Sequence, residues 1–123
     1  MRKEEIVTEL VNSVDRNGLV ATLYGVFGES VKVSIPFSQK ACDMSIDDID
    51  FSPRANNSLK RAGFFTISQV IDLIADDGLL RIRNLGKKTQ NEIKTRIMVF
   101  GYERLNEKEK KRFFYDVIER NAI

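Results

Sequence analysis

The first part of the sequence combines one helical apolar pattern with two strand-like runs. Between residues 3 and 15 apolar positions recur every three or four residues, so we predict a helix that ends at Asn17-Gly18. Two runs rich in β-branched and aromatic residues follow, Leu19–Phe27 and Val31–Phe37, and the second alternates between apolar and polar positions. We therefore predict a β-hairpin that packs on the first helix or on another protein.

The second part of the sequence shows helical patterns with clear start signals. Three predicted helices follow a residue that is suited to capping a helix, and these caps are Ser52, Thr66 and Asn106. A further helix is predicted to begin at Lys87 and to end at Gly101. The last helix covers residues 106–120 and carries a basic cluster, for which a solvated surface is the simpler interpretation.

These patterns predict an α+β protein, with an N-terminal helix plus β-hairpin followed by a compact all-α bundle and an extra C-terminal helix. We expect a helix-plus-hairpin unit at residues 1–42, a helical domain at 43–105 and a basic C-terminal helix at 106–123. The polar, acidic stretch from Gln39 to Asp50 is interpreted as the linker, with Ile46, Ile49 and Phe51 packed onto the helical domain.

Charge is distributed unevenly along the sequence. The net charge of the 123 residues is only +2, but residues 1–50 carry a net −4 and residues 51–123 a net +6. The basic second part is therefore the candidate for binding nucleic acid, although such asymmetry also occurs on solvated helix faces.

The composition argues against catalysis. The protein has one cysteine, Cys42, and no histidine, so it lacks an internal disulfide, a Cys/His zinc site and every histidine-based nucleophile pair. No segment approaches the roughly 20 apolar residues that span a bilayer. We expect a cytoplasmic protein that is not an enzyme and holds no metal or cofactor.

Two predicted helices carry positive charge in their first turn, where negative charge is favoured. A helix N-terminus carries partial positive charge and favours acids, yet Lys87 and Lys88 open one helix and Arg54 lies in the first turn of another. The helix after Thr66 has no cation in its first turn and serves as a control. A phosphate group is the simplest compensating partner for such starts.

Two segments of the basic part resemble a known family. They are Phe51–Gly63 and the run from Leu79 to Thr89 that is followed by Glu92-Ile93-Lys94. Together they look like the C-terminal domain of the bacterial RNA polymerase alpha subunit, and the second is similar to a helix-hairpin-helix type loop. The resemblance covers a little under half of the sequence. It implies a bundle of four helices plus a nonstandard helical turn.

The resemblance also implies a function and a set of contact residues. Domains of this family bind the minor groove of A·T-rich DNA and contact transcription activators. By position, the arginine that enters the groove falls on Arg54, and Asn84 and Glu92 fall where the family keeps supporting or contact residues. The implied DNA-binding residues are Arg54, Asn57, Ser58, Asn84, Gly86, Lys87, Lys88, Thr89 and Glu92.

Some features depart from the family pattern, and several functions stay open. Ser58 stands where the family often has cysteine, Pro53 replaces a small or aliphatic residue, and the loop at Asp76-Asp77-Gly78 is slightly longer. The large assembly domain of an alpha subunit is missing, which indicates a stand-alone module. DNA binding in transcription regulation is our first hypothesis.

Three alternatives remain beside that hypothesis. One is a protein-interaction module for RNA polymerase, a sigma factor or an activator, and another is the same fold without DNA affinity. The third, a repair enzyme with Asp47 and Asp48 at a metal, is disfavoured because no metal-binding constellation stands out. The exposed hairpin edge suggests that residues 1–42 could form a homodimer.

Overall fold

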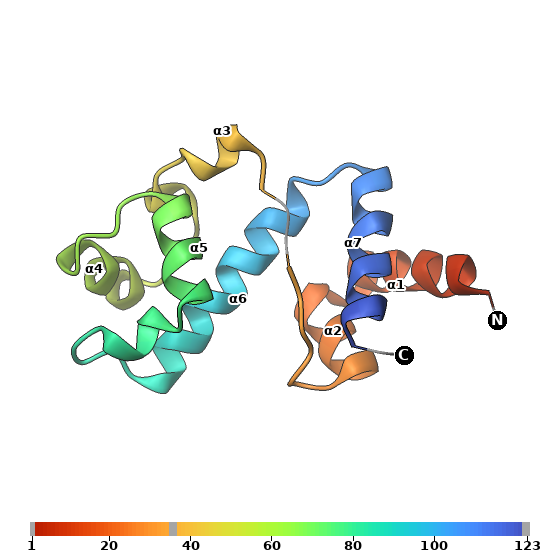
Figure 1. Cartoon of the computed structure of the whole chain (residues 1–123), viewed down its shortest axis with the longest axis horizontal. Coiled ribbons are helices and arrows are strands. Elements are labelled where there is room, and N and C mark those ends of the chain that lie inside the picture. The colour runs from red at the N-terminus through yellow and green to blue at the C-terminus, as the bar shows by residue number, and fades with distance from the viewer. Residues whose placement is uncertain (1, 35–36, 122–123) are drawn as a thin grey trace. The chain divides into compact units, whose positions relative to one another are not determined.

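The protein folds into two compact helical units. A computed structural model describes residues 2–34 and 37–121 (Figure 1). Residues 1–36 and 101–123 contribute to one unit, here called the terminal unit, and residues 37–100 form the other, here called the central unit. No described helix is both long enough and apolar enough to cross a membrane.

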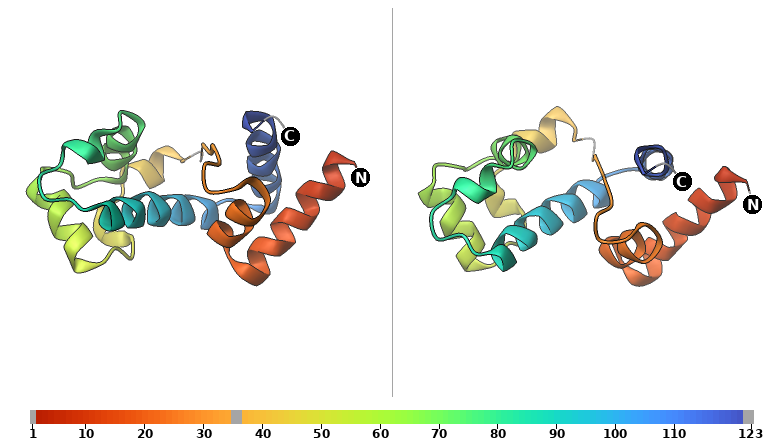
Figure 2. Two further views of the ribbon diagram at one scale, coloured as in Figure 1. Left: turned by 90° about the horizontal axis from the view of Figure 1, so that it is seen from below. Right: turned by 60° about the horizontal axis from the view of Figure 1, so that its bottom comes forward.

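The terminal unit is built from three helices drawn from both ends of the sequence. Helix α1 (Lys3–Asn17) packs against α2 (Leu19–Phe27) and against α7 (Glu107–Arg120). Gly18 separates α1 from α2 with a φ of 92°, a value that favours glycine, and it permits the sharp change of direction in Figure 2. The predicted end of the first helix at Asn17-Gly18 is therefore confirmed.

The predicted β-hairpin and the α+β class are wrong. Leu19–Phe27 is an α-helix, and no residue in the described ranges 2–34 and 37–121 belongs to a named strand. The buried residues of α2 are Leu19, Thr22 and Leu23, a spacing of three and four that suits a helix packed on α1. Short apolar runs are ambiguous, and here packing on α1 overrides the β-type composition.

The second predicted strand is not a strand where it is described. Its described residues, 31–34 and 37, are irregular, and Ile35 and Pro36 of the predicted run lie outside the described residues. The backbone of Lys32 instead pairs with a side chain after α7. Its N–H donates to Asn121 Oδ1 at 2.9 Å, and Asn121 Nδ2 donates to its carbonyl at 3.0 Å. The Asn121 amide thus satisfies the backbone N–H and carbonyl of Lys32, which in a hairpin would bond to a neighbouring strand.

Three aromatic rings fill the core of the terminal unit beside α7. Tyr102 packs edge-to-face on Phe113 and Phe114, with ring centroids 5.5 and 5.9 Å away. The Tyr102 side chain is only 3% exposed, and its hydroxyl is buried without a hydrogen-bond partner among the described residues. Burial, followed by the nearby carboxylates of Asp15 and Glu107, raises the pKa of Tyr102 to about 12.

This raised pKa predicts a loss of stability at alkaline pH. Above the ordinary tyrosine pKa the unfolded protein releases the proton while folded Tyr102 keeps it. Stability should then fall by up to about 1.4 kcal/mol per pH unit between roughly pH 10 and 12. Urea unfolding across this range should show that fall, and Tyr102→Phe should remove it. Because the replacement also deletes an unpaired buried hydroxyl, it should cost little or nothing at neutral pH.

The central unit is an all-helical bundle, as predicted for this part of the sequence. It extends over residues 37–100, so the stretch from Gln39 to Asp50 is part of the bundle and not a linker. Its elements are α3 (Gln39–Cys42), the short η1 (Ile46–Asp48), α4 (Pro53–Arg61), α5 (Ile67–Ala75), the short η2 (Gly78–Arg81) and most of α6 (Lys87–Glu103). The fully buried side chains of its core include Ile46, Ala55, Leu59, Ile67, Val70, Leu79 and Ile93. The expected packing of Ile46, Ile49 and Phe51 onto this domain is confirmed.

Three helix starts follow the predicted cap signals. Ser52 caps α4 with Pro53 in the first turn, and Thr66 and Asn106 form capping boxes at α5 and α7. The predicted end of α6 at Gly101 is wrong, since the helix continues to Glu103. Gly101 and Tyr102 are both buried, and packing of this last turn outweighs the weak helix propensity of glycine.

Candidate nucleic-acid interface

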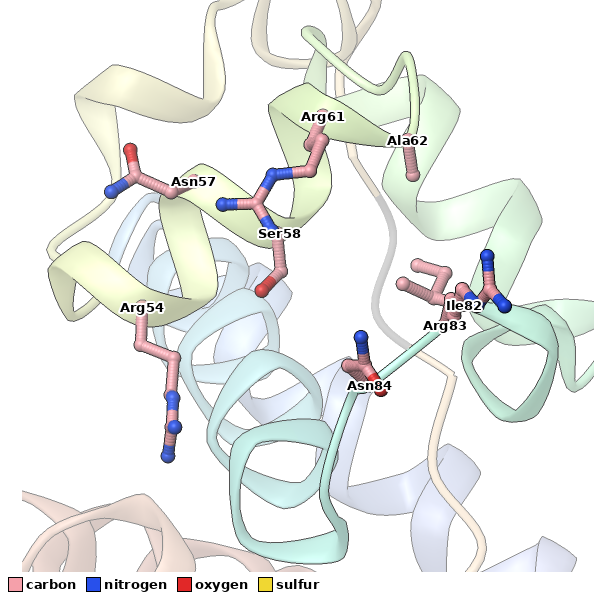
Figure 3. A pocket seen from close by; sticks show the side chains of 8 residues that line it. All are labelled: Arg54, Asn57, Ser58, Arg61, Ala62, Ile82, Arg83 and Asn84. Atoms are coloured by element: carbon pink, nitrogen blue, oxygen red, sulfur yellow. The ribbon is translucent and has the colours of Figure 1, made fainter.

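A concavity of about 460 Å³ lies on the central unit between α4 and the loop that precedes α6. Figure 3 shows the side chains that border it, with Arg54, Ser58 and Arg61 projecting from α4 and Asn84 from the facing loop. The full lining is Arg54, Asn57, Ser58, Arg61, Ala62, Ile82, Arg83 and Asn84. The structure thus brings together four of the nine predicted contact residues.

The amphipathic pattern of α4 determines which side chains face the concavity. Ala55 and Leu59 are fully buried in the core of the central unit. Residues 54, 57, 58 and 61 recur at the complementary helical spacing, and they form the outer face. Arg54 lies in the first turn, so its guanidinium is exposed at the edge of the concavity.

The opposite wall depends on a tight turn between η2 and α6. Asn84 has a φ of 62°, the left-handed conformation that asparagine tolerates better than most residues. The buried side chain of Leu85 anchors the turn, and its N–H bonds to the Ile82 carbonyl at 3.4 Å. Asn84 is thereby held at the surface with its side chain at the concavity.

The start of α6 follows directly after this turn. Gly86, Lys87 and Lys88 are exposed, and a side chain added at Gly86 would meet nothing within 4 Å. The first-turn amides of a helix have no intrahelical partner, so this open end suits a close anionic group. Thr89 is only 8% exposed, which places its side chain largely inside the unit. None of these four residues lines the concavity itself.

Glu92 holds the two helices of the site together. One carboxylate oxygen accepts from the Ser52 N–H and the other from the Ser52 hydroxyl, both at 2.7 Å. The same hydroxyl oxygen accepts from the Ala55 N–H at 3.2 Å and so caps α4. With both oxygens engaged inside the central unit, Glu92 supports the position of α4 and Arg54.

Glu92→Ala should therefore lower the free energy of unfolding by about 1.5–3 kcal/mol, because two donors lose a charged acceptor. Urea denaturation followed by circular dichroism measures this change. Glu92→Gln retains an acceptor oxygen and should cost less. The same loss from Asn91→Ala, an exposed neighbour on α6, would contradict the supporting role.

The acidic residues before α4 do not gather as a metal site. Asp47 accepts hydrogen bonds from the Lys60 ammonium at 2.7 Å and from Asn56 at 3.1 Å. The Lys60 bond, followed by the Asn56 bond, holds the pKa of Asp47 below its ordinary value. Among residues 2–34 and 37–121, no group of three or more His, Cys, Asp or Glu could hold a metal ion.

Two arginines that line the concavity were not predicted as contact residues. Arg61 and Arg83 line it, yet neither belongs to the contact set implied by the resemblance. The sequence nevertheless contains a feature that points to each of these two arginines. Arg61 follows Arg54 by seven residues, which returns to the same face of a helix, and Arg83 immediately precedes Asn84. All three arginines are exposed, and no ion pair joins any of them within the described part of the protein.

Known proteins resemble this one over about half of its sequence. It is 42% identical over 62 residues to a DNA-directed RNA polymerase subunit alpha from Symbiobacterium thermophilum, covering 50% of this chain and 19% of that protein. The corresponding subunit of Clostridium perfringens is 39% identical over 70 residues, covering 56% and 22%. The match thus spans about a fifth of the length of these relatives. No solved structure matches the sequence.

The family match covers the central unit almost completely. Residues 35–98 match the family described as the C-terminal domain of the bacterial RNA polymerase alpha subunit, and this range is just over half of the protein. It includes α4, the Asn84 turn and the start of α6, which together carry the concavity. The protein therefore belongs to the family of C-terminal domains of bacterial RNA polymerase alpha subunits.

Proposed function

We propose that this protein is a non-enzymatic DNA-binding protein that acts in transcription. It contacts the DNA backbone and the minor groove of A·T-rich duplex through the outer face of α4 and the start of α6. The contact residues are Arg54, Asn57, Ser58, Asn84, Gly86, Lys87, Lys88 and Thr89, with Glu92 in support. We place this activity in the cytoplasm, where bacterial DNA is transcribed.

One observation carries this proposal. Arg54 and Asn84, which the resemblance implies from distant parts of the sequence, border the same concavity of a domain whose family belongs to RNA polymerase. The walls hold arginines and neutral polar groups, and no carboxylate of the described residues lines them. Such a surface attracts phosphate while leaving hydrogen-bonding groups for the sugar and base edges.

The preference for A·T-rich sequence has a physical basis. A-tracts have a narrow minor groove with enhanced negative potential, and an inserted arginine responds to that potential rather than to individual bases. Arg54 is suited to this role because it lies in the exposed first turn of α4. The side chains of its neighbours Asn57 and Ser58 are shorter, so the Arg54 guanidinium can extend beyond them.

Fluorescence anisotropy with labelled duplexes tests the proposal. The purified protein should bind an A·T-rich duplex more tightly than a G·C-rich duplex of the same length. Affinity should also fall as salt rises, because phosphate contacts release counterions. Equal binding to both duplexes would contradict the minor-groove assignment, and no binding to either would contradict DNA binding altogether.

Lys87 and Lys88 should matter for DNA binding and not for folding. Cations at a helix N-terminus destabilise it, so Lys87→Gln/Lys88→Gln should leave stability unchanged or raise it by about 0.3–1 kcal/mol. The same change should weaken DNA binding and flatten its salt dependence. Urea unfolding and anisotropy on one preparation measure both effects. Weaker folding together with weaker binding would instead indicate a structural role.

A second candidate function is supported by the terminal unit. Tyr24 and Val26 of α2 are 40% and 55% exposed, and they lie outside the family match. Exposed apolar side chains favour a protein contact, here with RNA polymerase, a sigma factor or an activator. Co-sedimentation with purified polymerase in the absence of DNA tests this function, with Tyr24→Ser/Val26→Ser as the variant that should not co-sediment.

The homodimer through residues 1–42 stays a prediction. It was based on an exposed hairpin edge, and the described residues of this segment form no strand. Sedimentation velocity at micromolar concentration measures the oligomeric state directly. A monomer would leave the exposed side chains of Tyr24 and Val26 free for a different protein.

A further inference from the structure

The concavity carries more positive charge than a single groove contact uses. Three arginines border it, one at each end of the outer face of α4 and one on the facing turn: Arg54, Arg61 and Arg83. Figure 3 shows Arg54 and Arg61 on α4, across the opening from Arg83. In the contact set implied by the resemblance, Arg54 is the only one of the three.

Among the residues that the structure describes, these arginines lack an acidic partner of the kind that Lys60 has. Lys60, adjacent to Arg61 on α4, is paired with Asp47 at 2.7 Å. No such pair is found for Arg61 or Arg83 in the described ranges 2–34 and 37–121. Their charge is therefore available to a ligand, and a guanidinium fork matches the oxygens of a phosphate group.

The spacing along α4 separates the roles of the arginines. Arg54 and Arg61 are seven residues apart, which corresponds to a rise of about 10 Å along the helix. The minor groove of B-DNA is only about 6 Å wide. With α4 lying across the groove and Arg54 inside it, Arg61 would therefore lie beyond the groove edge, beside the sugar-phosphate backbone.

We infer that Arg61 and Arg83 form a phosphate-binding pair that holds the DNA backbone beside the groove contact of Arg54. This inference rests on the proposed DNA-binding function and adds two residues with a different role. The pair binds phosphate irrespective of base sequence, whereas Arg54 responds to the groove. Together the three arginines would fix the register of the domain on the duplex.

Salt-dependent anisotropy on the full-length protein distinguishes these roles. Arg61→Gln/Arg83→Gln should weaken binding to A·T-rich and G·C-rich duplexes by the same factor, roughly 10- to 100-fold at low salt. The slope of log affinity against log salt should shrink by about 2, one for each lost phosphate contact. The ratio between the two duplexes should stay at the wild-type value.

A matched variant controls for net charge. Arg96→Gln/Arg112→Gln removes two exposed arginines that do not line the concavity, and it should leave the slope close to wild type. An unchanged slope in Arg61→Gln/Arg83→Gln would overturn the inference while the proposed function stands. An equal change in the control variant, or loss of the A·T preference in the concavity variant, would also overturn it.

Inorganic phosphate separates a backbone contact from a site for a free anion. Titration of phosphate into the wild-type protein, followed by NMR of the arginine side-chain N–H groups, should shift Arg61 and Arg83 more than Arg96. If the wild type binds no duplex, the proposed function fails and the DNA assignment of the pair fails with it. Phosphate shifts that spare Arg61 and Arg83 would overturn the pair itself.

Discussion

Replacing Arg54 by alanine should weaken binding to A·T-rich DNA by about 10- to 100-fold and abolish the preference over G·C-rich DNA. The side chain is exposed in the first turn of α4 and borders the concavity. Its removal deletes the group that enters the groove while the core of the central unit stays intact. Anisotropy titrations of both duplexes measure affinity and preference in one experiment.

The stability of this variant should match that of the wild type. Arg54 has no ion pair in the described part of the protein, and it sits at a helix N-terminus where a cation is unfavourable. Unfolding in urea should therefore show a change within about 0.5 kcal/mol. A variant that binds poorly and also unfolds easily would not support a direct DNA contact.

Arg54→Lys separates charge from geometry at the same position. Lysine keeps the positive charge but presents it as a compact ammonium without the planar fork. Most of the salt dependence should survive, because phosphate attraction depends on charge. The A·T preference should shrink, since arginine is better suited to a narrow groove. Full retention of the preference would show that shape recognition lies elsewhere on the surface.

Local capping chemistry made the helices of the central unit predictable. Ser52 and Thr66, like Asn106 in the terminal unit, each use a side-chain oxygen to satisfy an amide of the first turn, and sequence shows such oxygens directly. The turn at Asn84 could also be predicted from the sequence, because it separates two successive apolar patterns. These features depend on contacts within a few residues.

The terminal unit depends on contacts that are distant in sequence. The run Leu19–Phe27 is helical because its buried face packs on α1, although its composition resembles a strand. The backbone of Lys32 is satisfied by Asn121, 89 residues away. No local pattern shows that α7 completes the unit begun by α1, so the sequence could not reveal this core.

The contrast between local and distant contacts also explains which residues of the candidate site could be predicted. Arg54 and Asn84 were identified through a resemblance that compares residues one at a time. Arg61 and Arg83 became visible once the turn was placed opposite α4, because only the fold shows which arginines share a concavity. Glu92 was implied as a supporting or contact residue, and its two hydrogen bonds to Ser52 show how it supports the site.

Phe114→Ala should unfold the terminal unit and leave the central unit folded. Phe114 is 0% exposed and stacks edge-to-face on Phe113 and Tyr102, with ring centroids 5.0 and 5.9 Å away. Truncation of such a ring costs about 3–5 kcal/mol, which is most of the stability of a small unit. Hydrogen exchange should lose protection in residues 2–34 and 101–121 and keep it in residues 37–100.

DNA binding is a second measurement on the Phe114→Ala variant. The concavity and its supporting core lie within residues 37–100, so Phe114→Ala should retain the wild-type A·T preference. Ile93→Ala is the matched change in the central core, where Ile93 is also fully buried, and it should remove DNA binding. Loss of binding in both variants would mean that the central unit cannot act without the terminal unit. Retention in Phe114→Ala alone would assign the terminal unit to a separate task, for which the exposed Tyr24 and Val26 are the first residues to test.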